Sequence, residues 1–432
     1  MIKEKINEKV IIEHLNNGLD VILIPKKNAV RTYAMYATHF GSLNYKFKVP
    51  GEEEITTVPD GVAHFLEHKL FEEEDGINAL DKLSKLGANA NAYTSFNHTA
   101  YLFSCTDKFD ESFDALLSFV QNPYLTEENV EKEKGIIGQE IKMYDDDPDW
   151  QLFFGFLNCL YKDHAITKDI AGTVDTIAEI TPETLYKCYN TFYDPSNMVI
   201  CVAGNIDTDK VLEKIRSSVK DMPEKSKIER YYGEIGEGVY KNRVEKKMDV
   251  SIPMAIIGFK DTENMQMIDS GYVVDNFDKV LKHVAMEILL EMLVGKSTKL
   301  YEELYNEGLV TKEFGIDYTF EEDYAYSSIS CESNNVEEVI DRIKNRIDEL
   351  KQNGLDEAEF NRTKRMLYGS YIKIFDSVSS CARVFINDYF RGINSFDYVD
   401  AYKNVTIEYA KNVLDKHFDF NKMAISIIQT NK

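Results

Sequence analysis

Cysteine, positive charge and long apolar runs are all scarce in this sequence. Its 432 residues include six cysteines, none of them in a C-x-x-C pair, so neither a disulfide framework nor a cysteine zinc site is indicated. No apolar stretch approaches the ~20 residues of a membrane-spanning helix. The N-terminal segment MIKEKINEKVIIEHLNNG has no apolar core and no small-residue cleavage site, which predicts a cytoplasmic protein with reduced thiols.

The shortage of positive charge sets limits on partners. The chain has 50 lysines and arginines against 74 aspartates and glutamates, a net charge of −24. A field of that sign repels phosphate backbones and anionic lipid, so nucleic-acid and membrane partners are disfavoured, whereas basic peptides would be attracted. The 44% hydrophobic and 29% charged residues are ordinary values for a globular protein, and the length indicates two or three domains.

The sequence HFLEH, residues 64–68, is the strongest chemical signal. In a helix, His68 returns to within about 40° of His64, so both imidazoles can reach one metal ion. Glu67 stands beside them without being a ligand, which suits a general base that accepts a proton from water. The pattern H-x-x-E-H arises by chance in roughly 1% of chains of this length. A helix over residues 60–73 with Asp60 as its N-cap is predicted to carry it.

A second helix supplies carboxylates at the spacing of a buried stripe. Glu133, Ile136, Ile137 and Glu140 stand at i, i+3, i+4 and i+7. Burying two carboxylates beside isoleucines is costly unless a cation or hydrogen bonds compensate, although a stripe at the edge of the core would leave them solvated. Combined with the histidine pair, Glu140 completes a three-ligand metal site with an open fourth position. Glu133, on the same face, could orient a ligand.

The sequence divides into two similar halves. The first is expected to contain strands within residues 9–48 and a hairpin turning near Phe96-Asn97. An ungapped comparison at an offset of 225 aligns a helix, a loop and a strand at the end of each half. The identical pairs include Thr181 and Thr406, Glu183 and Glu408, Met198 and Met423, and Ile200 and Ile425. We therefore expect domains at 1–224 and 246–432, the second without an H-x-x-E-H, joined by a linker at 225–245.

Four segments together resemble the pitrilysin/insulinase family of zinc metallopeptidases, the inverzincins. They are HFLEHKLF, GANANAYTSFNHTAY, EKEKGIIGQEIKMYDDDP and FYDPSNMVICVAG. The similarity covers nearly the full length. Within the family, HFLEHKLF, the DDDPDW run and LYNEGL are most similar to a bacterial group, the YmfH-type proteins. The resemblance implies an α+β fold of two related halves, each a mostly antiparallel sheet packed with helices, as in LuxS/MPP-like metallopeptidases.

The resemblance also assigns roles to residues. It implies that His64, His68 and Glu140 bind Zn²⁺, that Glu67 is the catalytic base and that Glu133 supports a ligand. Asn91 and Ala92, with Thr94 as a further candidate, would lie on the strand that pairs with an extended substrate. The implied function is that of a zinc endopeptidase, or the catalytic subunit of one.

The resemblance further implies a paired subunit, because two pairs of such halves normally enclose one chamber. That partner would be a chain of the same fold, in a heterodimer or a homodimer. Active family members usually carry an arginine and, seven residues later, a tyrosine in the second half, whereas this chain has Tyr305 and then Thr311 or Lys312. The alternative is a non-catalytic peptide-binding or assembly subunit, which an intact Glu67 argues against. A nucleotide-dependent enzyme is disfavoured, because Gly295-Lys296-Ser297-Thr298 lacks the leading glycine of a phosphate loop.

Overall fold

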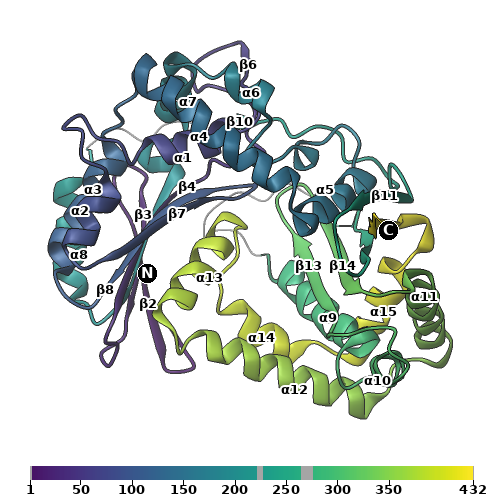
Figure 1. The fold of residues 1–432 in the computed structure, drawn as a ribbon. Coiled ribbons are helices and arrows are strands. Elements are labelled where there is room, and N and C mark those ends of the chain that lie inside the picture. The colour runs from purple at the N-terminus through teal and green to yellow at the C-terminus, as the bar shows by residue number, and fades with distance from the viewer. Residues whose placement is uncertain (1, 221–226, 264–275, 432) are drawn as a thin grey trace. The chain divides into compact units, whose positions relative to one another are not determined.

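The computed structural model describes residues 2–220, 227–263 and 276–431, and within them the chain forms two compact units (Figure 1). Each unit is assembled from three segments of the chain. Unit 1 consists of Met1–Lys142, Lys168–Tyr232 and Lys373–Phe390, and unit 2 consists of Met143–Thr167, Gly233–Ile372 and Arg391–Lys432. Both combine a sheet with helices, so the predicted α+β class is confirmed.

Unit 1 is built on one mixed sheet. Its strands are β1 (Ile2–Lys5), β2 (Glu8–His14), β3 (Asp20–Pro25), β4 (Thr32–Thr38), β7 (Asn89–Thr94), β8 (Thr99–Cys105) and β9 (Met198–Gly204). They follow the order β1-β2-β3-β9-β4-β8-β7, with β3 and β9 parallel and every other pair antiparallel. The turn predicted near Phe96-Asn97 does join β7 to β8. A separate small sheet pairs β5 (Lys46–Lys48) with β6 (Ile55–Thr57) and β10 (Glu229–Arg230).

Helices pack on both faces of this sheet. The helices of unit 1 are α1 (Val62–Lys69), α2 (Ala79–Lys85), α3 (Phe109–Gln121), α4 (Glu127–Asp145), α6 (Val174–Ala178), α7 (Pro182–Phe192), α8 (Thr208–Ser218) and α13 (Val378–Phe390), of which α1, α2, α3, α8 and α13 contact its strands. The central strand β9, MVICVAG, is buried along its whole length, because α13 packs on it and on β4 while α3 packs on β4 and β8 from the opposite face.

Unit 2 repeats this plan with fewer strands. Its sheet contains β11 (Arg243–Met248), β12 (Met254–Lys260), β13 (Gly315–Phe320), β14 (Ala325–Glu332) and β15 (Met423–Thr430). The order is β11-β15-β12-β14-β13, and only β11 and β15 run parallel. Its helices are α5 (Pro148–Leu160), α9 (Phe277–Val294), α10 (Lys299–Asn306), α11 (Val336–Asn353), α12 (Glu357–Ile374), α14 (Asp397–Asn404) and α15 (Ile407–His417).

The two sheets have the same topology. The order β3-β9-β4-β8-β7 of unit 1 corresponds strand for strand to β11-β15-β12-β14-β13 of unit 2. The repeat at offset 225 holds for the element boundaries as well, since α7 and α15, and then β9 and β15, begin 225 residues apart. Thr181 and Thr406 cap the two helices in the same way, each accepting a backbone N–H three residues on. The prediction of two related halves is confirmed.

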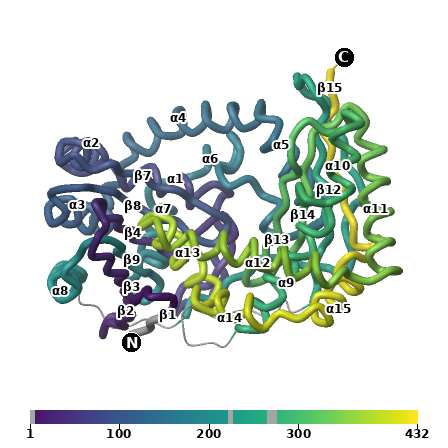
Figure 2. The backbone as a smooth tube through the Cα atoms, turned by 90° about the horizontal axis from the view of Figure 1, so that it is seen from below, coloured from purple at the N-terminus to yellow at the C-terminus, as the bar shows by residue number. Residues whose placement is uncertain are grey.

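Each unit takes one covering helix from the other half of the sequence. Helix α5 follows α4 in the first half but packs on β15, β12 and β11 of unit 2, whereas α13 follows α12 in the second half but packs on β9 and β4 of unit 1 (Figures 1 and 2). Both helices have 13 residues. The domain limits 1–224 and 246–432 therefore stay a proposal about the repeated halves, because the compact units are not contiguous in sequence.

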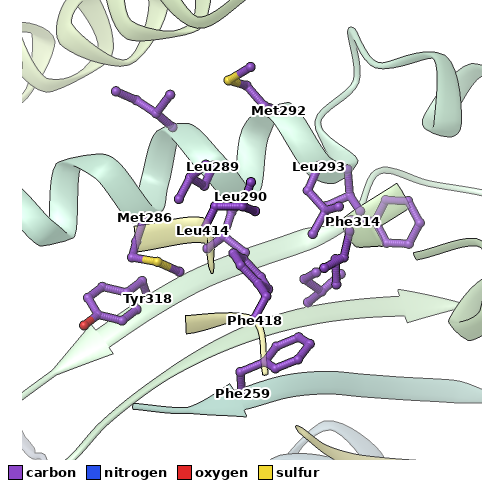
Figure 3. Close-up of a cluster of buried hydrophobic side chains, with 14 of the residues drawn as sticks. Phe259, Met286, Leu289, Leu290, Met292, Leu293, Phe314, Tyr318, Leu414 and Phe418 are labelled. Atoms are coloured by element: carbon purple, nitrogen blue, oxygen red, sulfur yellow. The ribbon is translucent and has the colours of Figure 1, made fainter. Parts of the chain in front are cut away.

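The core of unit 2 lies between α9 and its sheet. Figure 3 shows Met286, Leu290 and Leu293 of α9 among Leu414, Phe418 and Phe259, and all six are buried. Residues 286, 290 and 293 recur at the i, i+4, i+7 spacing of one helical face. No helix within the described residues is long and apolar enough to cross a membrane.

The close approach of α5 to its sheet predicts a glycine requirement. A Cβ on Gly258 of β12 would lie 2.2 Å from the carbonyl oxygen of Ser327 and 2.4 Å from the ring of Phe156 on α5. We expect Gly258→Ala to lower the free energy of unfolding by about 1–3 kcal/mol through overpacking, measured by denaturant titration. Gly369→Ala, in open space on α12, is the matched control and should be neutral or slightly stabilising. Equal effects of the two substitutions would contradict the packing argument.

Candidate metal centre

Helix α1 begins at a glycine that no other residue could replace without strain. Gly61 has φ of +89°, and a Cβ there would lie 2.4 Å from the carbonyl oxygen of Ala171. The prediction that Asp60 is the N-cap was wrong, because its carboxylate instead pairs with Lys168 at 2.7 Å. The helix, Val62–Lys69, is also shorter than the predicted 60–73. Gly61 thus fixes where α1, the helix that carries HFLEH, begins.

The three predicted ligands converge. His64 Nε2 lies 3.7 Å from Glu140 Oε1, and His68 Nε2 lies 3.6 Å from Glu140 Oε2. One ligand atom from each residue falls within 4.8 Å of the others, and no other such group of His, Cys, Asp or Glu occurs in the described part of the chain. Zinc–nitrogen bonds of about 2.0–2.1 Å place tetrahedral ligand atoms ~3.4 Å apart. The donor atoms fit a zinc ion with little adjustment.

The protonation of the imidazoles also suits a metal. Burial, and then the neighbouring His68, lower the pKa of His64 to about 4, so His64 is neutral near pH 7. Burial would lower the pKa of His68 too, but its hydrogen bond with Glu133 and the nearby carboxylates raise that pKa. A neutral imidazole is the form that binds metal, and a carboxylate partner makes His68 a more basic ligand.

Glu133 and a buried lysine hold His68 in place. His68 Nδ1 lies 3.0 Å from Glu133 Oε1, which leaves Nε2 directed toward Glu140. Lys69 is fully buried, with Nζ 2.7 Å from Glu72 Oε2 and 3.6 Å from Glu133 Oε2. The contacts with His68 and Lys69 keep the pKa of Glu133 below its usual value although burial opposes this. Lys69 therefore compensates the charge of a buried carboxylate.

Glu67 is held by a strand that follows the motif helix. Thr94 Oγ1 of β7 donates to Glu67 Oε2 at 2.6 Å and lies 3.2 Å from Thr99 Oγ1. Glu67 is 7% exposed. Burial raises the pKa of Glu67 to about 6, while the Thr94 hydrogen bond opposes the rise. The carboxylate is thus poised to exchange a proton near neutral pH.

The stripe on α4 is only partly as predicted. Glu133 and Ile137 are buried, at 5% and 0% exposed, but Ile136 is 49% exposed. The prediction that Ile136 belongs to a buried stripe was wrong, because the helix turns that residue to solvent while Glu133 and Glu140 face α1. The buried face of α4 is therefore narrower and more polar than the spacing suggested.

Asn91 and Ala92 lie on β7, the edge strand of the unit 1 sheet. In the sheet order β7 has only β8 as a neighbour. The N–H of Ala92 donates to Asn91 Oδ1 at 2.9 Å in an exposed contact. Thr94, on the same strand, contacts Glu67 directly. The strand that holds Glu67 is thus also an edge that another strand could join.

Two sets of contacts around these residues were not predicted from the sequence, those of Lys69 and that of Thr94. Lys69 and Glu72 were not considered, although a lysine directly after the second histidine was a visible signal. The hydrogen bond from Thr94 to Glu67 joins residues 27 apart, and periodicity carries no sign of it. In unit 2, Tyr305 lies in the last turn of α10 and is 54% exposed, and Lys312 pairs with Glu332.

Comparisons with known proteins relate the whole chain to one family of peptidases. The model of the insulinase family, peptidase family M16, matches residues 56–182, and the peptidase M16 inactive domain matches residues 179–367. The uncharacterized zinc protease YmfH of Bacillus subtilis is 38% identical over 98% of this chain and 97% of its own length. The zinc protease PqqE of Helicobacter pylori is 26% identical over 86% of this chain and 81% of its own.

Solved structures show the same fold. A chain from Alicyclobacillus acidocaldarius described as an M16-like peptidase superposes with a TM-score of 0.92, at 32% identity, covering 99% of both chains. The periplasmic protease PqqL of Escherichia coli superposes with a TM-score of 0.76 at 16% identity, over 97% of this chain and 47% of that one. The resemblance to pitrilysin/insulinase proteins and to their YmfH-type group is confirmed. The chain belongs to the insulinase family of peptidases, M16.

Proposed function

We propose that this chain is a zinc-dependent endopeptidase, or the catalytic subunit of one. The observation that carries the proposal is the convergence of His64, His68 and Glu140 on one point, with the buried Glu67 beside it. A site that only stabilises structure has no need of a carboxylate with a raised pKa next to its ligands.

In this proposal each side chain has one task. Zn²⁺ bound by His64, His68 and Glu140 would act as a Lewis acid that acidifies water and polarises a peptide carbonyl. Glu67 accepts the proton of the attacking water and returns it to the leaving amine. Thr94 holds the Glu67 carboxylate in position, and Glu133 fixes the tautomer of His68.

The substrate would bind as an added strand along β7. An extended peptide can hydrogen-bond to the free edge of Asn89–Thr94, with Asn91 and Ala92 opposite the residues next to the cleaved bond. The Ala92 N–H, which now donates to Asn91 Oδ1, is a donor that such a peptide could use. Because Thr94 on this strand contacts Glu67, the same edge would bring the peptide to the base.

We also propose that the active form contains a paired subunit of the same fold. Tyr305 and the pair Thr311 and Lys312 stand where family members usually carry the arginine and tyrosine that grip the substrate. The match to a model described as an inactive domain, over residues 179–367, supports a second half without catalytic groups. PqqL is about twice as long as the part that matches this chain, so one polypeptide there has room for a second pair of halves.

The absence of the arginine and tyrosine favours a second candidate function, that of a peptide-binding or assembly subunit in which zinc is structural. The two functions differ in the need for Glu67. Zinc binding without any Glu67-dependent hydrolysis, alone or with a partner, would favour the binding function.

The first test removes the base. In the zinc-loaded chain with its paired subunit present, Glu67→Gln should lower the kcat for a quenched fluorescent peptide by ~10²–10⁴ because it cannot accept a proton. Its zinc content, measured by atomic emission, should stay the same. Glu111→Gln, at an exposed site on α3, is the matched control and should keep full activity. Full activity of Glu67→Gln would refute the proposed base.

The second test concerns the ligands. Glu133→Gln weakens the hydrogen bond that orients His68, so we expect the zinc Kd to rise by about 10–100-fold in competition with a chromogenic chelator. Glu140→Gln removes a ligand and should raise the Kd further. Glu128→Gln, exposed on the same helix, controls for the loss of one charge. A Kd unchanged in Glu140→Gln would exclude this metal site.

The third test concerns the partner. The zinc-loaded chain alone should show little peptide cleavage, because a missing transition-state donor costs ~10²–10³ in rate. Adding a family member that carries the arginine and tyrosine should restore cleavage, and light scattering should detect the pair. Rapid cleavage by the chain alone, abolished by Glu67→Gln, would show that no partner is needed.

A further inference from the structure

The edge strand β7 presents two different faces to anything that pairs with it. In the register of the sheet, Asn91 stands opposite Leu102, which stands opposite Met35. Asn91 therefore shares the face of Met35, as Tyr93 and Asn89 do, because directly opposed residues point the same way. Ala92 and Thr94 belong to the other face, where Thr94 meets Glu67.

Arg383 of α13 reaches the first of these faces. Its guanidinium carbon lies 5.4 Å from the ring centre of Tyr93 and 5.9 Å from that of Tyr33, both within the range of a cation–π contact. Tyr33 is in the same row of the sheet as Asn89, and Tyr93 is four residues further along β7. A side chain that contacts both rings lies near the level of Asn91, midway between them.

The charge of Arg383 stands out on this chain. The protein has a net charge of −24, yet Arg383 is exposed and forms no ion pair with any carboxylate of the described residues. An arginine is always charged, and its planar guanidinium can stack on aromatic rings while its N–H groups remain free to donate. The two tyrosines thus hold a cation at the edge of the sheet without neutralising it.

We propose that Arg383 selects an acidic side chain in the substrate, so that the substrate class is an extended peptide with Asp or Glu at one fixed position. The proposal rests on the proposed function, since it assumes that the peptide pairs with β7. The peptide residue opposite Asn91 projects toward α13 and Arg383, whereas its two neighbours project toward α1 and Glu67. One side chain beside the cleaved bond is therefore presented to a guanidinium that can bind a carboxylate through two N–H groups.

The proposed pairing of Arg383 with an acidic side chain modifies the expectation, drawn from the net charge, that the protein attracts basic peptides. A net charge of −24 favours basic peptides at a distance, but the contact at this position is local and of opposite sign. A substrate that is basic overall, with one acidic residue at this position, satisfies both effects.

The test uses the zinc-loaded full chain, with its partner if one is required, and a synthetic peptide library with every position randomised. Sequencing of the products by mass spectrometry should show Asp and Glu enriched at one position near the cleaved bond. Arg383→Glu should replace that preference by Lys and Arg at the same position. For a matched pair of peptides with Glu or Lys there, we expect the ratio of kcat/KM to change by about tenfold or more.

Two variants and one binding measurement complete the design. Arg383→Lys should keep the acidic preference, and Arg365→Glu, an exposed arginine on α12, controls for the change in net charge. Fluorescence polarisation of the two labelled peptides on Glu67→Gln measures selectivity without turnover. Cleavage that depends on Glu67 but has the same sequence preference in Arg383→Glu and Arg365→Glu would overturn this inference alone. No Glu67-dependent cleavage in any variant would overturn the proposed function.

Discussion

The need to compensate buried negative charge governs the site. Glu67 and Glu133 are buried, and Glu140 faces the same point between α1 and α4. Each carboxylate has its own partner that offsets the cost of burial. Thr94 donates to Glu67, Lys69 lies beside Glu133, and the two histidines face Glu140. Unpaired charges in such a place would cost several kcal/mol each. A divalent cation held by His64, His68 and Glu140 would balance the negative charge that the protein side chains leave uncompensated.

Part of this arrangement is visible in the sequence and part is not. The meeting of His64 and His68 and the choice of Glu140 as the third candidate ligand could be predicted, because both follow from residue spacing along single helices. The predicted start of α1 and the predicted burial of Ile136 were wrong for a common reason. Both depend on the surroundings of the helix: Ala171 lies against Gly61, and the side chain of Ile136 faces solvent.

The larger architecture shows the same limit. The repeat at offset 225 was readable because α7 and α15 kept their capping threonines and their boundaries. The exchange of α5 and α13 could not be predicted from the sequence, because an apolar helix face does not indicate which of two similar sheets it covers. Nor could spacing reveal that Arg383, nearly 300 residues after Tyr93, contacts its ring. Contacts of this kind are set by topology, and they decide what the edge strand can recognise.

The exchanged helices also set the order in which the protein can be made. The strands of the unit 1 sheet are complete once Gly204 has been synthesised, but α13, which covers β9 and β4, ends at Phe390. At 5–20 residues per second the apolar face of that sheet would wait roughly 10–35 s for its cover. Unit 1 therefore cannot finish folding until Phe390 has been made, when only the segment Arg391–Lys432 of unit 2 is still missing, and its apolar sheet face stays uncovered during that interval.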